Sequence, residues 1–463
     1  MSTLSELDRR YLFHPMTALA THERSGPAPV IVKGQGVWLE DADGQRYIDA
    51  MAGLWCVNVG YGRREIAEAL EQQASKLSYC HTFSGVSSDK AILLAQRLIE
   101  MAPVPMSKVF FGNSGSDAND SAVKLVWYYQ NVRGRPEKKK IISRERSYHG
   151  VTIVSGSLTG LHGPHAGFDL PLPFVKHTTA PRPLWEGAGL TDAEFVARLV
   201  DDLEQLIQAE GPETIGAMVA EPVMGAGGVI VPPEGYFPAI KEVLTRHDIL
   251  LIADEVITGF GRLGRPFGTE IFGIEPDLIV VAKGVTSGYT PLSGLMVSEE
   301  VWRTVVSGEE RFGVFGHGFT YTAHPGPAAA ALANLDVIEK DQLVAQVASR
   351  GSYLKERLLA AFTDHPLVGD VRGMGLMWGV EFVAGRNPAV AFDPSLKVAG
   401  RVVREAFAQG VIGRALPQTD TIAFSPPFII SEGEIDTVVK AFREATDVVA
   451  QQLLDEGVWR PEA

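Results

Sequence analysis

The sequence predicts an α/β protein with a mainly parallel sheet, followed by a smaller α+β unit. Two observations predict this class. Through the middle of the chain, short apolar runs of strand type alternate with amphipathic helices, which is typical of a parallel sheet covered by helices. After residue 325 this alternation stops, and long helices precede a few short strands.

The larger unit contains helices that end at clear stop signals. Gly134 follows a helix at 116–131, and Gly211-Pro212 follows a helix at 192–210. The other elements expected here are a strand at 215–220, a helix at 234–247, and strands at 249–253 and 278–282.

The smaller unit is expected to begin near Pro325 with an Ala-rich helix. Its elements are helices at 325–339 and 343–362, a strand at 379–383, a helix at 396–408, a strand at 421–424 and a long C-terminal helix. We therefore expect an N-terminal segment (1–59) that packs with the small domain, a large domain (60–325) and a small domain (326–463).

Composition excludes several classes of function. The chain has 463 residues and a formal net charge of −14. Because phosphate binding needs clustered Lys and Arg, this balance argues against a nucleic-acid partner. No segment resembles a signal peptide or reaches the ~18 apolar residues of a membrane span. Two cysteines, and no CxxC or HExxH motif, predict no disulfide framework and no metal. We expect a soluble cytoplasmic protein.

Three further motifs are not predicted to take part in catalysis or cofactor binding. The basic run Lys138-Lys139-Lys140 follows Gly134 and Pro136 and is predicted to be a solvated loop. The stretch from Gly259 to Gly264 fits GxGxxG, but no amphipathic helix follows it, as a dinucleotide site requires. The SxxK match from Ser121 to Lys124 lies within a helix and lacks the accompanying serine-hydrolase motifs.

Three apolar strands end in a residue suited to chemistry: Glu221, Asp254 and Lys283. Ligands of open parallel sheets bind at the carboxyl ends of the strands, so an acid and a lysine at such ends could share one site. Each alone is weak evidence, because an Asp that closes a strand is more often a turn or helix-cap residue.

A small-residue segment, Gly112-Asn113-Ser114-Gly115-Ser116-Asp117, precedes a helix. Small residues permit close backbone approach, and the helix start offers free N–H groups and the positive end of the dipole, which suits a phosphate. The alternative is an ordinary helix start capped by Ser116 or Asp117.

At this point the sequence resembles the class III aminotransferases. The stretch from Asp254 to Gly264, followed by Pro276-Asp277-Leu-Ile and Ala282-Lys283-Gly284, is similar to the signature of that family. Four further blocks match in the same order: Asn113-Ser-Gly-Ser-Asp-Ala-Asn119, Ser147-Tyr-His-Gly150, Ala220-Glu-Pro-Val223 and His317-Gly-Phe-Thr-Tyr321. The segment from Ala52 to Gly60 is most similar to the (S)-selective ω-transaminase, or amine:pyruvate transaminase, branch.

The resemblance implies fold type I of the enzymes that use pyridoxal 5'-phosphate (PLP), and an obligate homodimer with shared active sites. It leaves open whether dimers pair into a tetramer. It implies that Lys283 forms the Schiff base and that Asp254 pairs with the pyridine nitrogen. The implied cofactor-binding residues are Gly115, Ser116, Tyr148, His149, Glu221, Asp254, Val256, Lys283 and Thr320, the last from the partner subunit. The implied substrate-binding residues are Trp55, Phe83, Tyr148, Ala226, Phe319 and Arg414.

Two positions depart from the family pattern. Asp117 stands where Glu is commoner, and Met224 stands where much of the wider family has Gln. The first change should be mild, and the second puts any polar contact at that position in doubt.

The chemistry needs these residue types. PLP supplies an electron sink, and a carboxylate such as Asp254 favours the protonated pyridine nitrogen. A lysine freed from the cofactor moves the proton if its pKa is lowered. Arg414, in the loop-like stretch Gly413-Arg-Ala-Leu-Pro-Gln, is predicted to swing in for carboxylate substrates only. The alternative is a surface arginine.

We expect transfer of an amino group from an aryl or alkyl amine, or an ω-amino acid, to pyruvate. The cofactor would alternate between PLP and pyridoxamine 5'-phosphate. The alternatives are a β-alanine, taurine or polyamine:pyruvate transaminase, an aminomutase or a PLP decarboxylase, and a PLP-free binding protein. The presence of both Lys283 and Asp254 disfavours the last of these.

Overall fold

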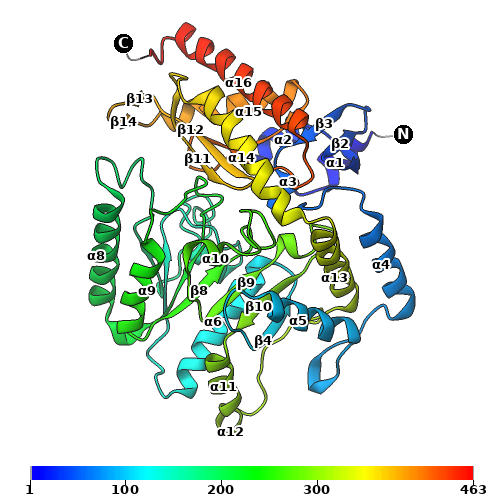
Figure 1. Cartoon of the computed structure of the whole chain (residues 1–463), viewed down its shortest axis with the longest axis vertical. Coiled ribbons are helices and arrows are strands. Elements are labelled where there is room, and N and C mark those ends of the chain that lie inside the picture. Colours follow the sequence, from blue (N-terminus) through cyan, green and yellow to red (C-terminus); the bar gives the residue numbers. More distant parts are fainter. Residues whose placement is uncertain (1–2, 462–463) are drawn as a thin grey trace.

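The structure, a computed structural model, describes residues 3–461. Its larger unit is a seven-stranded sheet of order β4-β10-β9-β8-β7-β5-β6 (Figure 1). The strands are β4 (Lys108–Gly112), β5 (Lys140–Arg144), β6 (Val175–Thr178), β7 (Ile215–Ala220), β8 (Leu250–Asp254), β9 (Leu278–Val281) and β10 (Ser293–Val297). Strands β5 to β9 pair in parallel, whereas β10 is antiparallel to β4 and β9. The expected α/β class is confirmed.

Helices cover both faces of this sheet. Leu250 and Ile252 of β8 pack in the apolar layer of α6 (Gly115–Val132), whereas Leu251 between them packs in the layer of α8 (Asp192–Glu210) and α9 (Tyr236–Arg246). This alternation follows from the two-residue period of a strand, and it makes a strand buried on both faces apolar throughout. The helices are α4 (Arg64–Lys76), α5 (Asp89–Met101), α6 (Gly115–Val132), α7 (Ile153–Leu158), α8 (Asp192–Glu210), α9 (Tyr236–Arg246), α10 (Gly268–Phe272), α11 (Glu299–Ser307), α12 (Glu309–Phe312) and α13 (Pro325–Lys340).

A second unit lies above the sheet in Figure 1 and contains the C-terminal part of the chain. Its antiparallel sheet has the order β11-β12-β17-β16. Its elements are α14 (Leu343–Phe362), β11 (Val368–Met374), β12 (Met377–Phe382), β13 (Gly385–Arg386), β14 (Ala389–Val390), α15 (Val398–Ala408), β16 (Arg414–Ala415), β17 (Thr421–Phe424) and α16 (Glu432–Asp455). The domain boundary near Pro325 stays a proposal, since α13 packs on α4 and α5.

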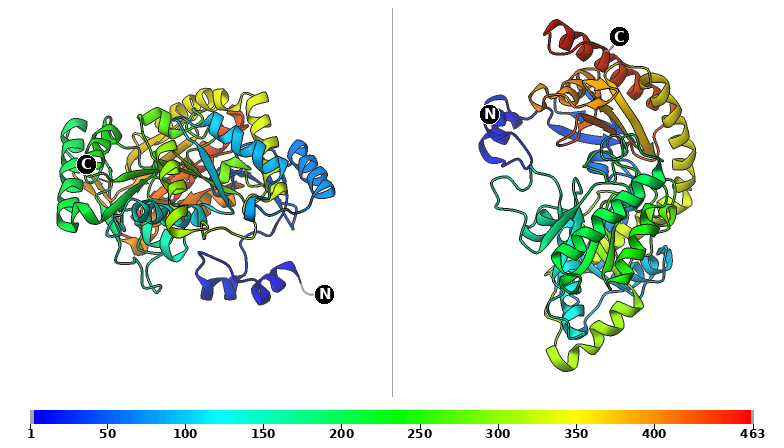
Figure 2. Two further views of the ribbon diagram at one scale, coloured as in Figure 1. Left: turned by 90° about the horizontal axis from the view of Figure 1, so that it is seen from below. Right: turned by 90° about the vertical axis from the view of Figure 1, so that its left-hand side faces the viewer.

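The N-terminal segment joins this second unit through a strand pair. Strand β3 pairs in parallel with β15, where Ile48 lies opposite Val411. Helices α1 and α2 lie on the outside of the molecule (Figure 2). The elements are α1 (Leu4–Tyr11), α2 (Leu19–Ser25), β1 (Ile31–Gln35), β2 (Trp38–Asp41), β3 (Arg46–Asp49), α3 (Ala52–Trp55) and, from the other end of the chain, β15 (Val411–Ile412). No helix within residues 3–461 is both long and apolar enough to span a membrane.

The solvated loop expected at Lys138-Lys139-Lys140 is wrong. Lys138 is buried, and its Nζ donates to the backbone oxygens of His247 and Asp248 at 2.9 and 2.8 Å. Lys140 begins β5, and its Nζ lies 2.8 Å from Glu210. The physical reason is that carbonyls just past the end of α9 need donors, which the lysine amine supplies.

Candidate active site

The three strand-end residues meet at one edge of the large sheet. Glu221 directly follows β7, Asp254 is the last residue of β8, and Lys283 lies two residues beyond β9. Because β7, β8 and β9 are adjacent and parallel, their carboxyl ends lie side by side. The grouping expected from the sequence is therefore present.

Asp254 is buried and held on three sides. Its Oδ2 lies 2.7 Å from His149 Nδ1 and accepts from Asn119 Nδ2 at 3.0 Å, and its Oδ1 accepts from the Val256 N–H at 3.1 Å. Asn119 also donates to the His149 carbonyl at 2.8 Å. The carboxylate thus has a fixed orientation. The motif around Asn119 does not by itself indicate a role for this residue, but a buried polar amide in a helix interior, where Asn is unfavourable, is a signal of one.

Glu221 orders the neighbouring loop through its side chain. Its Oε1 accepts from the Tyr148 N–H at 3.0 Å, and its Oε2 accepts from the Gly225 N–H at 2.9 Å. Burial raises the pKa of Glu221, and the positive side chain of Arg144 opposes the shift. Both carboxylate oxygens of Glu221 are thus engaged within the chain, where they fix the backbone that carries the Tyr148 ring.

Lys283 sits in a strained and dehydrated position. Its φ is +45°, in the left-handed region that is costly for residues other than glycine, and such strain is concentrated at functional sites. Burial lowers the pKa of Lys283, while Asp254 acts in the opposite direction. A lysine amine with a lowered pKa holds and releases a proton nearer neutral pH.

The start of α6 is capped by Ser114, not by Ser116 or Asp117 as the alternative expectation had it. Ser114 Oγ accepts from the Asp117 N–H at 3.2 Å, and Asp117 Oδ1 accepts from the Ser114 N–H at 3.0 Å. This reciprocal pair is a capping box. It leaves Gly115 and Ser116 as the first helical residues, whose N–H groups have no intrahelical acceptor.

Gly150 allows the Ser147–Gly150 loop to lie against this helix start. Its φ is +135°, and a Cβ there would lie 2.4 Å from Ser116 Oγ. Ser116 Oγ also accepts from the Val151 N–H at 3.2 Å. The loop and the start of α6 therefore form one continuous surface beside Val256, whose methyl groups face Gly115.

An apolar cluster lies beside Lys283. Trp55 and Ala226 are buried in it, and Tyr148 packs against it. Two cations lie close to the Trp55 ring: the Lys283 Nζ is 6.0 Å from its centroid, and the Arg414 guanidinium carbon is 5.4 Å from it. Burial lowers the pKa of Arg414, and Tyr148 acts in the opposite direction.

The loop expected around Arg414 is wrong, as is the surface alternative. Arg414 is partly buried and begins the short strand β16, where it lies opposite Ala423 of β17. The strand pairing fixes its backbone, so only the side chain has freedom to move.

The remaining predicted residues form a separate group. Phe83 is 47% exposed and packs on Gly318, and the Thr320 carbonyl accepts from Tyr79 Oη at 2.8 Å. Phe319 belongs to the same surface segment, where its N–H donates to Thr322 Oγ1 at 2.8 Å. Within the described part of one chain, no hydrogen bond, ion pair or ring contact joins Phe83, Phe319 or Thr320 to Lys283, Trp55 or Arg414.

This geometry agrees with comparisons to known proteins. The family model described as aminotransferase class III matches residues 20–446. The chain is a class III aminotransferase. It has fold type I of the PLP-dependent enzymes, and the recognition made from the sequence is confirmed.

Individual aminotransferases are similar along nearly the whole chain. The diaminobutyrate–2-oxoglutarate transaminase of Halomonas elongata is 48% identical, with 98% of both chains covered. A chloroplastic gamma aminobutyrate transaminase of Solanum lycopersicum is 44% identical, with 94% of this chain and 84% of the relative covered. The crystal structure of the ω-transaminase from Pseudomonas jessenii in complex with PMP has a TM-score of 0.95 and 45% identity, and the match covers 97% of this chain and 99% of that chain.

The residues of this aminotransferase fit PLP, the cofactor of the class. The site offers an amine on Lys283, a buried carboxylate on Asp254 and a helix start for a phosphate. It also holds two buried polar atoms, His149 Nε2 and Trp55 Nε1, that have no hydrogen-bond partner among residues 3–461. Buried polar atoms of this kind normally have a partner, which a bound polar group would supply.

Proposed function

We propose that this aminotransferase moves an amino group from a primary amine, either an aryl or alkyl amine or an ω-amino acid, to pyruvate. The products are a ketone or aldehyde and alanine. The observation that supports this is the Trp55 ring, which has both the Lys283 amine, at 6.0 Å, and the Arg414 guanidinium, at 5.4 Å, close to its centroid. A small keto acid could place its carbonyl near Lys283 while its carboxylate meets Arg414.

The residue roles follow from position. Lys283 would carry the cofactor and then move the proton at the substrate carbon. Asp254, oriented by His149 and Asn119, would hold the proton on the pyridine nitrogen. The N–H groups of Gly115 and Ser116 would bind the phosphate, since a helix start favours an anion. When bound, PLP supplies the electron sink for the carbon that loses its proton.

The two half-reactions make different demands on Arg414. An uncharged amine leaves the guanidinium without a carboxylate, and an unpaired buried cation is costly. Trp55 lowers that cost, because a guanidinium over an indole ring is stabilised by the ring quadrupole. A carboxylate on pyruvate then offers a stronger, charge-assisted partner. One arginine can thus serve both substrates.

The acceptor proposed is a keto acid with one carboxylate. A dicarboxylate such as 2-oxoglutarate needs a second cation, and the cation that lies near Trp55 beside Arg414 is Lys283. Lys283 would be committed to the cofactor. A second candidate has support from the relatives, whose names include diaminobutyrate–2-oxoglutarate and gamma aminobutyrate transaminases: an ω-amino acid or diamine donor with 2-oxoglutarate.

The test is a matrix of donors and acceptors. Donors are an arylalkylamine, β-alanine, taurine, a diamine, diaminobutyrate and gamma aminobutyrate; acceptors are pyruvate and 2-oxoglutarate. We expect alanine from pyruvate in preference to glutamate from 2-oxoglutarate, and turnover of the uncharged amine. Faster glutamate formation with every donor would establish the second candidate instead. Product without any acceptor would indicate an aminomutase, and release of carbon dioxide a decarboxylase.

Phe83, Phe319 and Thr320 belong to a second part of the proposal. We propose that this exposed group completes the active site of a neighbouring copy, so that the enzyme is a homodimer with shared sites. The support is the separation of these residues from Lys283 within one chain, together with the exposure of Phe83 and Thr320.

A further inference from the structure

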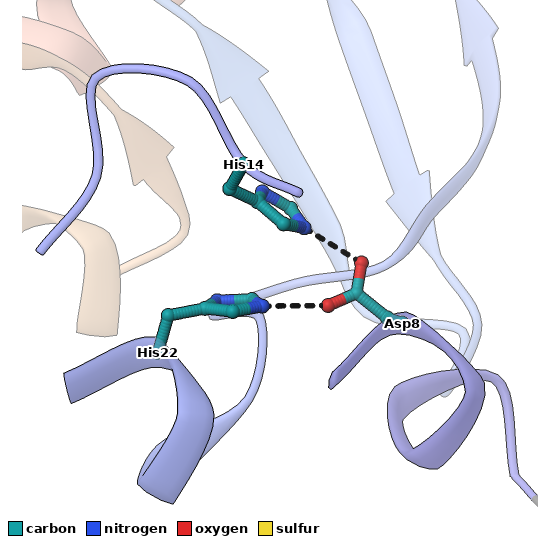
Figure 3. Close-up of side chains that lie close together, drawn as sticks. All are labelled: Asp8, His14 and His22. Carbon is teal, nitrogen blue, oxygen red and sulfur yellow. Dashed lines mark hydrogen bonds and ion pairs between the residues drawn. The ribbon is translucent and has the colours of Figure 1, made fainter. Parts of the chain in front are cut away.

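Three polar side chains meet in the N-terminal segment, far along the chain from the catalytic residues. Asp8 lies in α1, His22 lies in α2, and His14 lies in the connection between them (Figure 3). Asp8 Oδ2 is 2.8 Å from His14 Nε2, and Asp8 Oδ1 is 2.8 Å from His22 Nε2. One atom from each residue can be chosen so that all three lie within 4.8 Å of one another.

The setting of this cluster is unusual. None of the residues of α1 or α2 is buried, and large apolar side chains such as Leu12 and Phe13 are exposed. The polar cluster is the less accessible part: the side chains of Asp8 and His22 are only 14% and 11% exposed. The inside of this small helical hairpin is therefore polar while its outside is partly apolar.

Hydrogen bonding accounts for only part of the cluster. His14 and Asp8 form a hydrogen bond, whereas Asp8 Oδ1 and His22 Nε2 form an ion pair at 2.8 Å that does not have hydrogen-bond geometry. The two atoms approach each other without the alignment that a hydrogen bond needs. A cation between the three side chains would coordinate both atoms in place of this ion pair.

The ligand types indicate which cation. Two imidazole nitrogens and one carboxylate oxygen are a borderline donor set that suits Zn²⁺ and similar transition metals, not Mg²⁺ or Ca²⁺. Bonds of ~2.0–2.1 Å in tetrahedral geometry place ligand atoms about 3.3 Å apart, and one ligand atom from each of the three residues already lies within 4.8 Å of the others. Three protein ligands leave the fourth position for water.

We propose that Asp8, His14 and His22 bind one Zn²⁺ ion, which clamps α1 to α2. The class III family model begins at residue 20, so Asp8 and His14 lie outside the matched residues, although the Halomonas elongata relative covers 98% of this chain. The expectation of no metal rested on the absence of HExxH and CxxC motifs. Neither motif describes ligands that lie six and eight residues apart along a helix and a turn.

The test uses Co²⁺, which replaces Zn²⁺ and has a visible ligand-field spectrum. Tag-free holoenzyme is stripped of metal with a chelator and titrated with Co²⁺. We expect an absorption band that saturates at one Co²⁺ per chain and is bleached by added Zn²⁺. His14→Gln and His22→Gln should each weaken Co²⁺ binding at least about tenfold, the lower limit known for loss of a group that merely orients a ligand. His162→Gln, at an exposed histidine elsewhere, is the matched control.

Limited proteolysis gives a second measurement. Zn²⁺ should slow cleavage within residues 3–26 in the wild type and not in His22→Gln, while unchanged cofactor absorbance shows that the variant remains folded. No saturable Co²⁺ band would overturn the proposal. So would a band that survives in both histidine variants, because the metal would then lie elsewhere, for example at the cofactor.

Discussion

The carboxylate of Asp254 is held by more contacts than the position of an acid at the end of a strand would by itself provide. His149, Asn119 and the Val256 N–H all contact its carboxylate, and all of its polar atoms are accounted for. A carboxylate held in one orientation can keep a proton on a facing nitrogen without reorganising during the reaction.

Asp254→Asn should leave the cofactor bound and slow proton removal from the substrate by about a hundredfold or more. The contacts proposed for the phosphate, at Gly115 and Ser116, are untouched by this change. Single-turnover absorbance with an amine donor measures the step, and Asp192→Asn, at an exposed acid on α8, is the control. A near wild-type rate would refute the role proposed for Asp254.

Arg414→Ala should separate the two half-reactions. Loss of a charge-assisted pair costs roughly 1.5–3 kcal/mol, so pyruvate should bind on the order of ten- to a hundredfold more weakly. The reaction with an uncharged amine should change little, because it has no carboxylate to pair.

The measurement follows the cofactor spectrum in each half-reaction separately, with Arg404→Ala on the exposed side of α15 as the control. Equal damage to both half-reactions would mean that Arg414 supports the Trp55 ring structurally. Damage to neither would assign the carboxylate to another residue.

For single residues, the sequence predicted those whose role follows from their place after a strand. It did not predict those whose role depends on contacts with distant parts of the chain. Asp254 and Lys283 could be found because each follows an apolar strand. Lys138 was misjudged because a run of like charges does not reveal that one amine turns inward to the His247 and Asp248 carbonyls. Asn119 was missed because its two acceptors come from other elements of the chain.

Among the elements, α6 is central to the proposed function, because its first residues form the proposed phosphate site. Its capping box fixes the helix start, and the same box holds Asp117 in reach of Ser293 Oγ at 3.0 Å. The cap thus ties the start of α6 to β10, so the proposed phosphate site depends on a helix end that is anchored to the sheet.

Ser114→Ala should destabilise the protein by about 1 kcal/mol and also hasten loss of the cofactor. Thr191→Ala is a matched control, because Thr191 forms the same capping box at the start of α8, away from the site. Urea unfolding measures the first effect, and cofactor absorbance during dialysis measures the second. If the two variants lost cofactor equally, the start of α6 would have no special part in binding it.

The boundaries of helices and strands were predictable where Gly, Pro or other turn residues separate one element from the next. The expected ranges of α8, β7, α14 and β17 coincide with the structure, since Gly211-Pro212 ends one helix and turn residues isolate the others. Strand β16 was assigned to a loop because two residues carry no periodicity, and its pairing with β17 is a tertiary contact.

For the whole molecule, the surface group of Phe83, Phe319 and Thr320 is the reason to expect a homodimer. Each of two sites would combine Lys283 of one chain with Thr320 of the other. In a twofold dimer the same surface occurs on both subunits, so both sites are completed at once.

Complementation between inactive subunits tests this assembly. Lys283→Ala and Thr320→Asp are each expected to be inactive, the second because a negative charge would repel the phosphate. After mixing, one site of each hybrid dimer carries both lesions and the other carries neither, so about a quarter of wild-type activity should return. No recovery, despite subunit exchange demonstrated by mass spectrometry, would contradict a shared site.

The parallel pairing of β3 with β15 has a consequence for biosynthesis. Translation delivers β1, β2 and β3 among the first residues, but Val411, the partner of Ile48, leaves the ribosome only near the end. Until then the nascent chain presents β3 as an open strand edge, which is the kind of surface that pairs with other chains. A ribosome that stalls before residue 411 would release a product whose catalytic sheet is fully synthesised and whose first sheet has no closing strand.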